Sequence, residues 1–216
     1  MNNKKYINEI LYFSFIFLIF VFISISLVIY FDISRHWTNI YDQEFTLAYN
    51  ALLFNSGIRQ EFLVHSGYFT ILFLSIFILL AKLFQFLDFY NIFGLLNFND
   101  IDPPLQNLIS ITRIYAGISL AAWCTVINMI FYYFSNTKIY SLFLSLILLT
   151  FPGTFIHAFE LRTELMASIF MILSFLSMLK YLDHENYKNS KINLFFFFIF
   201  IYCAILNKSQ IFFYLF

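Results

Sequence analysis

Long apolar runs separated by short polar segments dominate the sequence. The first run, Ile10–Phe31, holds 22 residues without a charge, and about 20 apolar residues are enough to cross a bilayer as a helix. The pattern predicts an all-α, polytopic bundle of transmembrane helices with spans at 10–31, 114–134, 139–156, 165–182 and 192–206. A further apolar run, Ile211–Phe216, stops with the chain, so we expect the 216 residues to be the N-terminal part of a longer protein.

A polar stretch at 32–67 follows the first span. It contains a repeat of apolar residues at i, i+3, i+4, i+7 and i+8, formed by Phe45, Ala48, Tyr49, Leu52 and Leu53. This spacing predicts an amphipathic helix on the membrane surface. Asn55-Ser56-Gly57 predicts its end, because glycine commonly follows a helix C-terminus. The next run, Tyr68–Ala81, is shorter than a span, so we predict that 68–87 is an interfacial or re-entrant element.

The composition excludes a soluble protein. Hydrophobic residues make up 62% of the chain and charged residues 11%, whereas soluble domains average about 45–50% and about 25%. The formal net charge is zero, with 12 basic and 12 acidic residues, so nothing indicates a nucleic-acid partner. We therefore predict an integral membrane protein, with membrane lipids among its partners.

The basic residues predict an orientation, because lysine and arginine are more frequent in cytoplasmic loops. With the N-terminus inside and 68–87 not crossing, six lie on the inner side and three on the outer side. The inner residues are Lys4, Lys5, Lys138, Lys180, Lys188 and Lys191, and the outer ones are Arg35, Arg59 and Arg162. This favours a cytoplasmic N-terminus, and we expect the membrane to be a bacterial inner (plasma) membrane. It also puts the loop 32–67 and the turn Phe151–Glu164 on one outer face.

Acidic residues form two groups on this predicted outer face. In the first group, Asp42 and Glu44 stand where the surface helix opens. Backbone N–H groups and the helix dipole stabilise a carboxylate at that place. A functional pair fits this placement, and so does a plain N-cap followed by a first-turn charge.

The second group, His157, Glu160 and Glu164, shares one helix face because its members are three and four residues apart. Acids at a membrane boundary that face a bundle interior are functional candidates. The alternatives are a solvated patch paired with Arg162 and a divalent metal site. Lys208 follows the last span on the same face, where it can meet a lipid-linked phosphate or extend to the interface.

The order of these features resembles the GT-C integral membrane glycosyltransferases. That family has a first span, an outer loop in which an acidic pair opens a surface helix that ends before a glycine, and a second acid after a Pro-containing outer turn. Here the pair is Asp42-Gln43-Glu44, with Gln43 where the family has its second acid. Leu161–Met166 and Asn207-Lys208-Ser209 are similar to two further family phrases. The nearer relatives by this resemblance are the polyprenyl-phosphate-dependent protein mannosyltransferases, the aminoarabinose lipid A transferases and the rhizobial lipopolysaccharide glycosyltransferases.

The resemblance implies a GT-C-like fold and the transfer of a sugar from a polyprenyl-phosphate donor to a hydroxyl of a lipid or glycan acceptor, with inversion. The catalytic residues by this resemblance are Asp42, as general base, and Glu164. The substrate-binding residues are Glu44, His65, Glu160, Arg162 and Lys208, whose cations neutralise the phosphate leaving group. No cofactor is assigned, and a divalent metal stays open. The alternatives from other classes are a transporter or flippase of lipid-linked saccharides and a membrane subunit without activity.

Overall fold

The computed structural model describes residues 3–39, 43–61, 67–156, 160–182 and 190–208. Within these ranges the chain is built from helices and turns, without a strand. The helices are α1 (Asn3–Phe31), α2 (Glu44–Asn55), α3 (Tyr68–Leu83), α4 (Ile92–Leu96), α5 (Asp102–Ser135), α6 (Lys138–Thr150), α7 (Pro152–Ile156), α8 (Thr163–Leu182) and α9 (Ser190–Asn207). The prediction of an all-α chain is confirmed.

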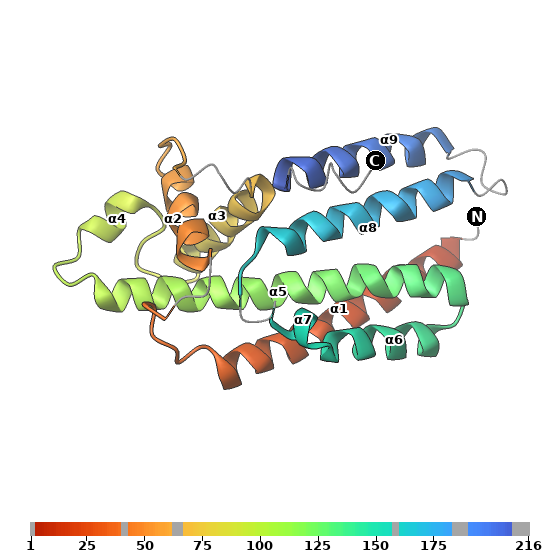
Figure 1. Cartoon of the computed structure of the whole chain (residues 1–216), viewed down its shortest axis with the longest axis horizontal. Helices are drawn as coiled ribbons and strands as arrows, with labels where there is room; N and C mark the ends of the chain where they lie inside the picture. Colours follow the sequence, from red (N-terminus) through yellow and green to blue (C-terminus); the bar gives the residue numbers. More distant parts are fainter. Residues whose placement is uncertain (1–2, 40–42, 62–66, 157–159, 183–189, 209–216) are drawn as a thin grey trace.

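Helices α1, α5, α6, α8 and α9 run side by side along the long axis of the molecule (Figure 1). In the described part of the chain, three helices are long and apolar enough to cross a membrane, namely α1, α5 and α8. Helices α6 and α9 are apolar but shorter. The bundle is that of an all-α membrane protein, as the apolar runs predict.

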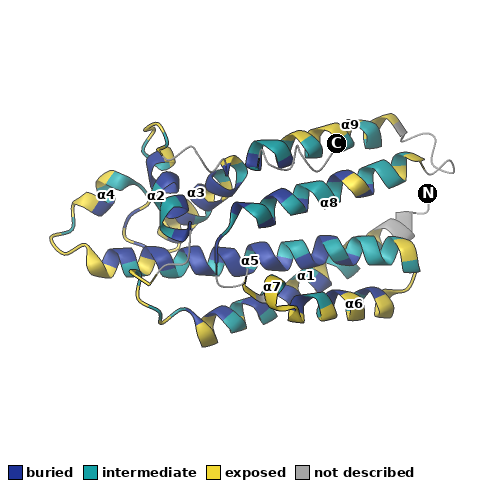
Figure 2. Ribbon diagram, viewed as in Figure 1, coloured by how far each residue is buried: buried dark blue, intermediate teal, exposed yellow. Residues whose placement is uncertain are grey.

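Helix α5 is longer than the span predicted at 114–134, because it begins at Asp102. Pro103 and Pro104 stand in its first turn, where proline is tolerated because those N–H groups have no intrahelical partner. Its 34 residues extend for about 51 Å at about 1.5 Å per residue, which is longer than a bilayer core of about 30 Å. Helices α2, α3 and α4 pack against the N-terminal part of α5 and share an apolar core with it (Figure 2).

The apolar run predicted as one span at 139–156 is divided between two helices. Helix α6 ends at Thr150 and α7 begins at Pro152, with Phe151 in an extended conformation between them. The proline ring clashes with the residue before it, which disfavours the α conformation at that residue. The predicted span is therefore a helix of 13 residues followed by a short one of 5.

Helices α1 and α5 approach closely where small residues face each other. A Cβ atom added to Gly117 would lie 3.2 Å from Cγ2 of Val28 and 3.5 Å from the carbonyl oxygen of Ser24. Small residues permit such close contacts between membrane helices. The contact holds the end of α1 beside the turn of α5 that precedes Gly117, and this brings Asp32 next to Arg113.

The structure does not test the predicted orientation, but it places basic residues that the charge count left out. The bundle end that carries the residues counted as outer also carries three more basic residues, which are Lys82, Arg113 and Lys208. The outer group rises from three to six and equals the inner group. The cytoplasmic N-terminus therefore stays a prediction, as does the interfacial or re-entrant assignment of 68–87.

Candidate functional site

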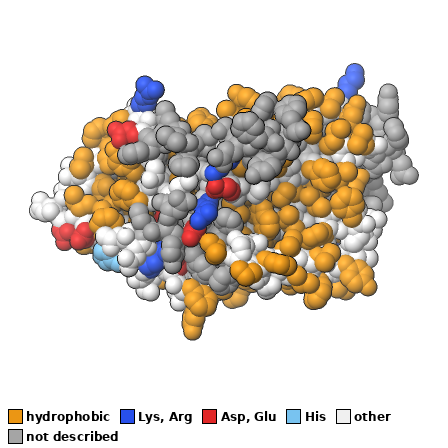
Figure 3. Space-filling model, viewed as in Figure 1, with side chains coloured by type: hydrophobic (Ala, Val, Ile, Leu, Met, Phe, Trp, Pro, Cys, Tyr) orange, Lys and Arg blue, Asp and Glu red, His pale blue; other side chains and the backbone are white. Residues whose placement is uncertain are grey.

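Charged side chains gather where the bundle meets α2 and α3, while the bundle surface beyond them is largely apolar (Figure 3). The two acidic groups that the sequence puts on one face contribute to two neighbouring clusters at this end. Each cluster is joined by ion pairs between residues far apart in the sequence. We call them the buried cluster (Asp32, Arg35, Glu44 and Arg113) and the open cluster (Glu160, Arg162, Glu164 and Lys208).

In the buried cluster two cations are paired with two carboxylates. Arg113 has no exposed surface, and its Nε lies 3.1 Å from Oε1 of Glu44 and 3.4 Å from Oδ2 of Asp32. Nε of Arg35 lies 2.9 Å from Oδ1 of Asp32, and its Nη2 lies 3.5 Å from Oε2 of Glu44. The cluster is formally neutral, which limits the cost of taking its four charges out of water.

Helix α5 also holds the backbone of the loop after α1. Nη1 of Arg113 donates to the carbonyl oxygens of Asp32, at 3.0 Å, and Arg35, at 2.5 Å. Two turns earlier on α5, Gln106 accepts a hydrogen bond from the N–H of Trp37 at 2.7 Å and donates one to the carbonyl oxygen of Arg35 at 3.1 Å. The loop that leads from the first span toward α2 is therefore fastened to α5 at two points.

Burial raises the pKa of Glu44 to about 7, although the adjacent Arg113 and Arg35 cations oppose the shift. Burial also raises the pKa of Asp32; the same two cations oppose that shift, and the negative charge of Glu160 adds to it. The influence of Glu160 on Asp32 shows that the two clusters are within electrostatic reach of each other. The protonated form of Glu44 is accessible near neutral pH.

The open cluster is more exposed to its surroundings. Nη2 of Arg162 lies 2.6 Å from Oε2 of Glu160, and the ammonium of Lys208, at the end of α9, is paired with Glu164, in the first turn of α8. The side chains of Glu164 and Arg162 are 43% and 33% exposed, whereas those of Lys208 and Glu160 are largely covered. A ligand that approaches this end of the bundle meets Glu164 and Arg162 first.

Asn207 fixes the position of the neighbouring Lys208. Its buried side chain accepts hydrogen bonds from the N–H and hydroxyl of Thr70, at 3.0 and 3.2 Å, and donates one to the carbonyl oxygen of Thr163 at 2.6 Å. Gly67 lies against the same place, because a Cβ atom there would overlap Cγ2 of Thr163. The ends of α3, α8 and α9 therefore meet at one point beside the open cluster.

The structure brings together some of the predicted site residues. Four of them form the open cluster. Glu44 opens α2, as the sequence predicts, but its carboxylate is fully buried against Arg113 and has no exposed surface. Gln43, which precedes it, is also buried. Asp42 and His65 lie outside the described residues.

The metal alternative combines His157 with Glu160 and Glu164. His157 lies outside the described residues, and among those that are described no three His, Cys, Asp or Glu side chains form a metal-binding group. Both carboxylates are paired with cations in the structure. The metal site stays a prediction.

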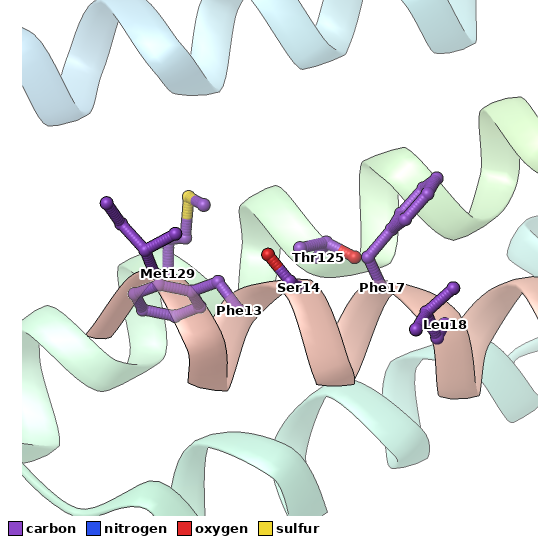
Figure 4. Close-up of a pocket in the computed structure, with 7 residues that line it drawn as sticks. Phe13, Ser14, Phe17, Leu18, Thr125 and Met129 are labelled. Atoms are coloured by element: carbon purple, nitrogen blue, oxygen red, sulfur yellow. The ribbon is translucent and has the colours of Figure 1, made fainter. Parts of the chain in front are cut away.

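An apolar hollow of about 460 Å³ lies between α1 and α5 (Figure 4). Phe13, Phe17 and Leu18 of α1 line it together with Thr125 and Met129 of α5, and no charged side chain contributes. Thr125 lies twelve residues beyond Arg113 on α5, a distance of about 18 Å along the helix. The hollow is therefore remote from the charged clusters and supplies no group for acid or base chemistry.

Sequence reasoning missed Asp32, Arg113 and Asn207. Asp32 directly follows the first predicted span and Arg113 directly precedes the second, where an ionisable residue either extends to the interface or faces the bundle interior as a functional candidate. Asn207 belongs to a phrase that resembles the family, but no spacing indicates its contacts, because its partners Thr70 and Thr163 are 137 and 44 residues away.

Comparisons with protein-family models, curated proteins and solved structures give no match to this chain. The assignment of a function therefore depends on the residues themselves and on their geometry.

Proposed function

We propose that the chain is a membrane glycosyltransferase that moves a sugar from a polyprenyl-phosphate carrier to a hydroxyl of a lipid or glycan acceptor. The observation that supports this proposal is the open cluster at the end of an apolar bundle, in which two cations are paired with two carboxylates and one member of each pair, Arg162 and Glu164, is partly exposed. A polyprenyl phosphate keeps its chain in the hydrocarbon and its phosphate at the boundary. Lysine and arginine bind phosphate at that level, arginine by paired hydrogen bonds.

The two cations are held in place by carboxylates before a substrate arrives. Arg162 is paired with Glu160, and Lys208 is paired with Glu164. A phosphate that displaces these carboxylates gains both cations, and it leaves Glu164 able to accept a hydrogen bond from the acceptor hydroxyl. Such an arrangement stabilises a leaving group whose negative charge grows in the transition state.

Asp42 is the general base in this proposal. It precedes Glu44 by two residues, and Glu44 is fixed by Arg113. The acceptor oxygen forms a bond to the anomeric carbon on the face opposite the phosphate, and the bond from that carbon to the phosphate oxygen breaks. Asp42 takes the hydroxyl proton. The products are the glycosylated acceptor, with inverted configuration, and polyprenyl phosphate.

The test uses membranes that contain the chain, incubated with polyprenyl phosphates that carry radiolabelled mannose, glucose or aminoarabinose. We expect release of polyprenyl phosphate with at least one donor, and loss of that release in Asp42→Asn and Glu164→Gln. Glu9→Gln is the matched control, because it removes a carboxylate near the opposite end of the bundle. Full release in Asp42→Asn would exclude Asp42 as the base. No release with any donor would contradict the proposal.

A further inference from the structure

Helix α3 is apolar on both faces: its inner face packs into the core through Ile71, Leu74 and Ile78, and a second apolar stripe faces outward. Thr70 and Ser75 are buried, and their hydroxyls bond to Asn207 and to the carbonyl oxygen of Leu72. The outward face carries large exposed side chains at i, i+3, i+7 and i+10, which are Phe73, Ile76, Leu80 and Leu83. A surface helix of a soluble protein has polar residues on its outward face. This outer stripe therefore requires an apolar medium.

Ring contacts place α3 beside the spanning helices rather than above them. The ring of Phe69 lies 5.1 Å from that of Phe170, about two turns into α8 from Thr163. The ring of Phe77 lies 5.5 Å from that of Tyr115, which follows Arg113 on α5. The stripe is thus level with the first turns of α8 and with the part of α5 next to Arg113.

A row of aromatic rings joins the surface of the bundle to α3. On α9 the rings of Phe196 and Phe200 are 5.8 Å apart, and Phe200 is 6.4 Å from Phe170 of α8. Phe170 contacts Phe69, and Phe69 is 6.2 Å from Phe73. The two ends of the row, Phe196 and Phe73, are both exposed. The apolar surface of the bundle therefore continues, ring by ring, onto α3.

The turn after α3 extends the stripe. The N–H of Phe86 donates to the carbonyl oxygen of Ala81 at 2.8 Å, and the N–H of Gln85 donates to the carbonyl oxygen of Lys82 at 3.1 Å. These two bonds form a Schellman cap. Gln85 takes a left-handed φ of 62° where glycine is usual. This well-bonded turn presents three side chains that are 70%, 66% and 69% exposed, namely Leu83, Phe84 and Phe86.

We propose that α3 is embedded in one leaflet of the bilayer through this stripe and the turn that follows it. Its 16 residues extend for about 24 Å, less than a bilayer core of about 30 Å, so α3 enters the lipid without crossing it. Its single charged residue, Lys82, stands in the last turn, and its ammonium donates to the carbonyl oxygen of Asp88 at 2.7 Å, so the charge is kept at the end of α3. The inference does not depend on the proposed function.

Spin labels test this placement in the full chain. In a background with Cys124→Ala and Cys203→Ala, single cysteines replace Ile76, Leu80 or Leu83, and the labelled protein is reconstituted in phosphatidylcholine–phosphatidylglycerol vesicles. Collisions of the label with oxygen, which concentrates in lipid, are compared with collisions with a water-soluble nickel chelate. We expect oxygen to dominate at all three positions and the chelate to be excluded from them.

Two positions on the same chain calibrate the measurement. Leu18 lies exposed in the middle of α1 and gives the value for lipid, and Asn97 lies exposed at the end of α4 and gives the value for water. We expect the three labels on α3 to match Leu18. Values like those of Asn97 would overturn the inference, because the stripe would then face water. Exclusion of both reagents would also overturn it, because protein, such as a second copy of the chain, would then cover the stripe.

Discussion

Replacing Arg113 with methionine removes a buried cation and keeps a side chain of similar length. The change leaves Arg35 as the cation next to Glu44 in the buried cluster, at 3.5 Å, and it removes one donor from each of the carbonyl oxygens of Asp32 and Arg35. Loss of one partner of a buried ion pair costs about 3–5 kcal/mol. Part of that cost is relieved when Glu44 takes up a proton, which its pKa of about 7 permits.

We therefore expect Arg113→Met to lose about 3 kcal/mol of stability at pH 8 and less at pH 5. In a domain of this size 1 kcal/mol moves the denaturation midpoint by about 2–4 °C, so the midpoint should fall by about 6–12 °C at pH 8. Heating in detergent followed by size-exclusion chromatography measures the midpoint. Arg59→Met is the matched control, because Arg59 is exposed. A fall at pH 8 no larger than the control's would refute the anchoring role of Arg113.

Three further changes test the contacts around the site, each by the same midpoint. The raised pKa of Glu44 means that its protonated form stabilises the fold; this contribution is complete below pH 4.5 and is lost as pH rises through about 7. The midpoint should thus decline between pH 5 and pH 8, and Glu44→Gln should flatten the decline while Glu9→Gln leaves it unchanged. Gly67→Ala should cost about 1–3 kcal/mol by crowding Thr163, and adding Thr163→Ser, which removes the crowded methyl group, should restore most of the loss. Asn207→Leu should cost about 1–3 kcal/mol for each buried polar group it leaves unpaired; a midpoint equal to that of the unchanged chain would show that these bonds do not hold α3 in place.

The helices that form the bundle were largely predictable from the sequence. The span predicted at 165–182 begins two residues after the start of α8, and the one at 192–206 lies within α9. The exceptions occur at prolines, since Pro103 and Pro104 begin α5 while Pro152 interrupts the run that contains α6. Hydropathy is an average over many residues, so it does not predict where a proline begins or ends a helix.

The site was predictable only in part, because its charges are paired through tertiary contacts. The prediction that Glu160 and Glu164 share a helix face is wrong, because Glu160 lies in the turn before α8, which begins at Thr163. The pairing of Glu160 with Arg162 is local and was predicted as one alternative. The partner of Glu164 is Lys208, 44 residues away. Arg113 and Glu44 are 69 residues apart, and no spacing rule connects them. Their pairing follows from the packing of α2 against α5 in a shared apolar core, which depends on the three-dimensional structure.

The most direct test of sugar transfer uses the purified chain in vesicles with a doubly labelled donor, which carries one radioactive label in the sugar and another in the phosphate of polyprenyl phosphate. We predict that the sugar label passes to an added lipid or glycan acceptor, that the phosphate label stays in polyprenyl phosphate in an equal amount, and that Glu164→Gln reduces both. If the two labels remain in one intact molecule that only changes leaflet, the chain moves lipid-linked saccharides without breaking the sugar–phosphate bond, and the proposed transfer is contradicted.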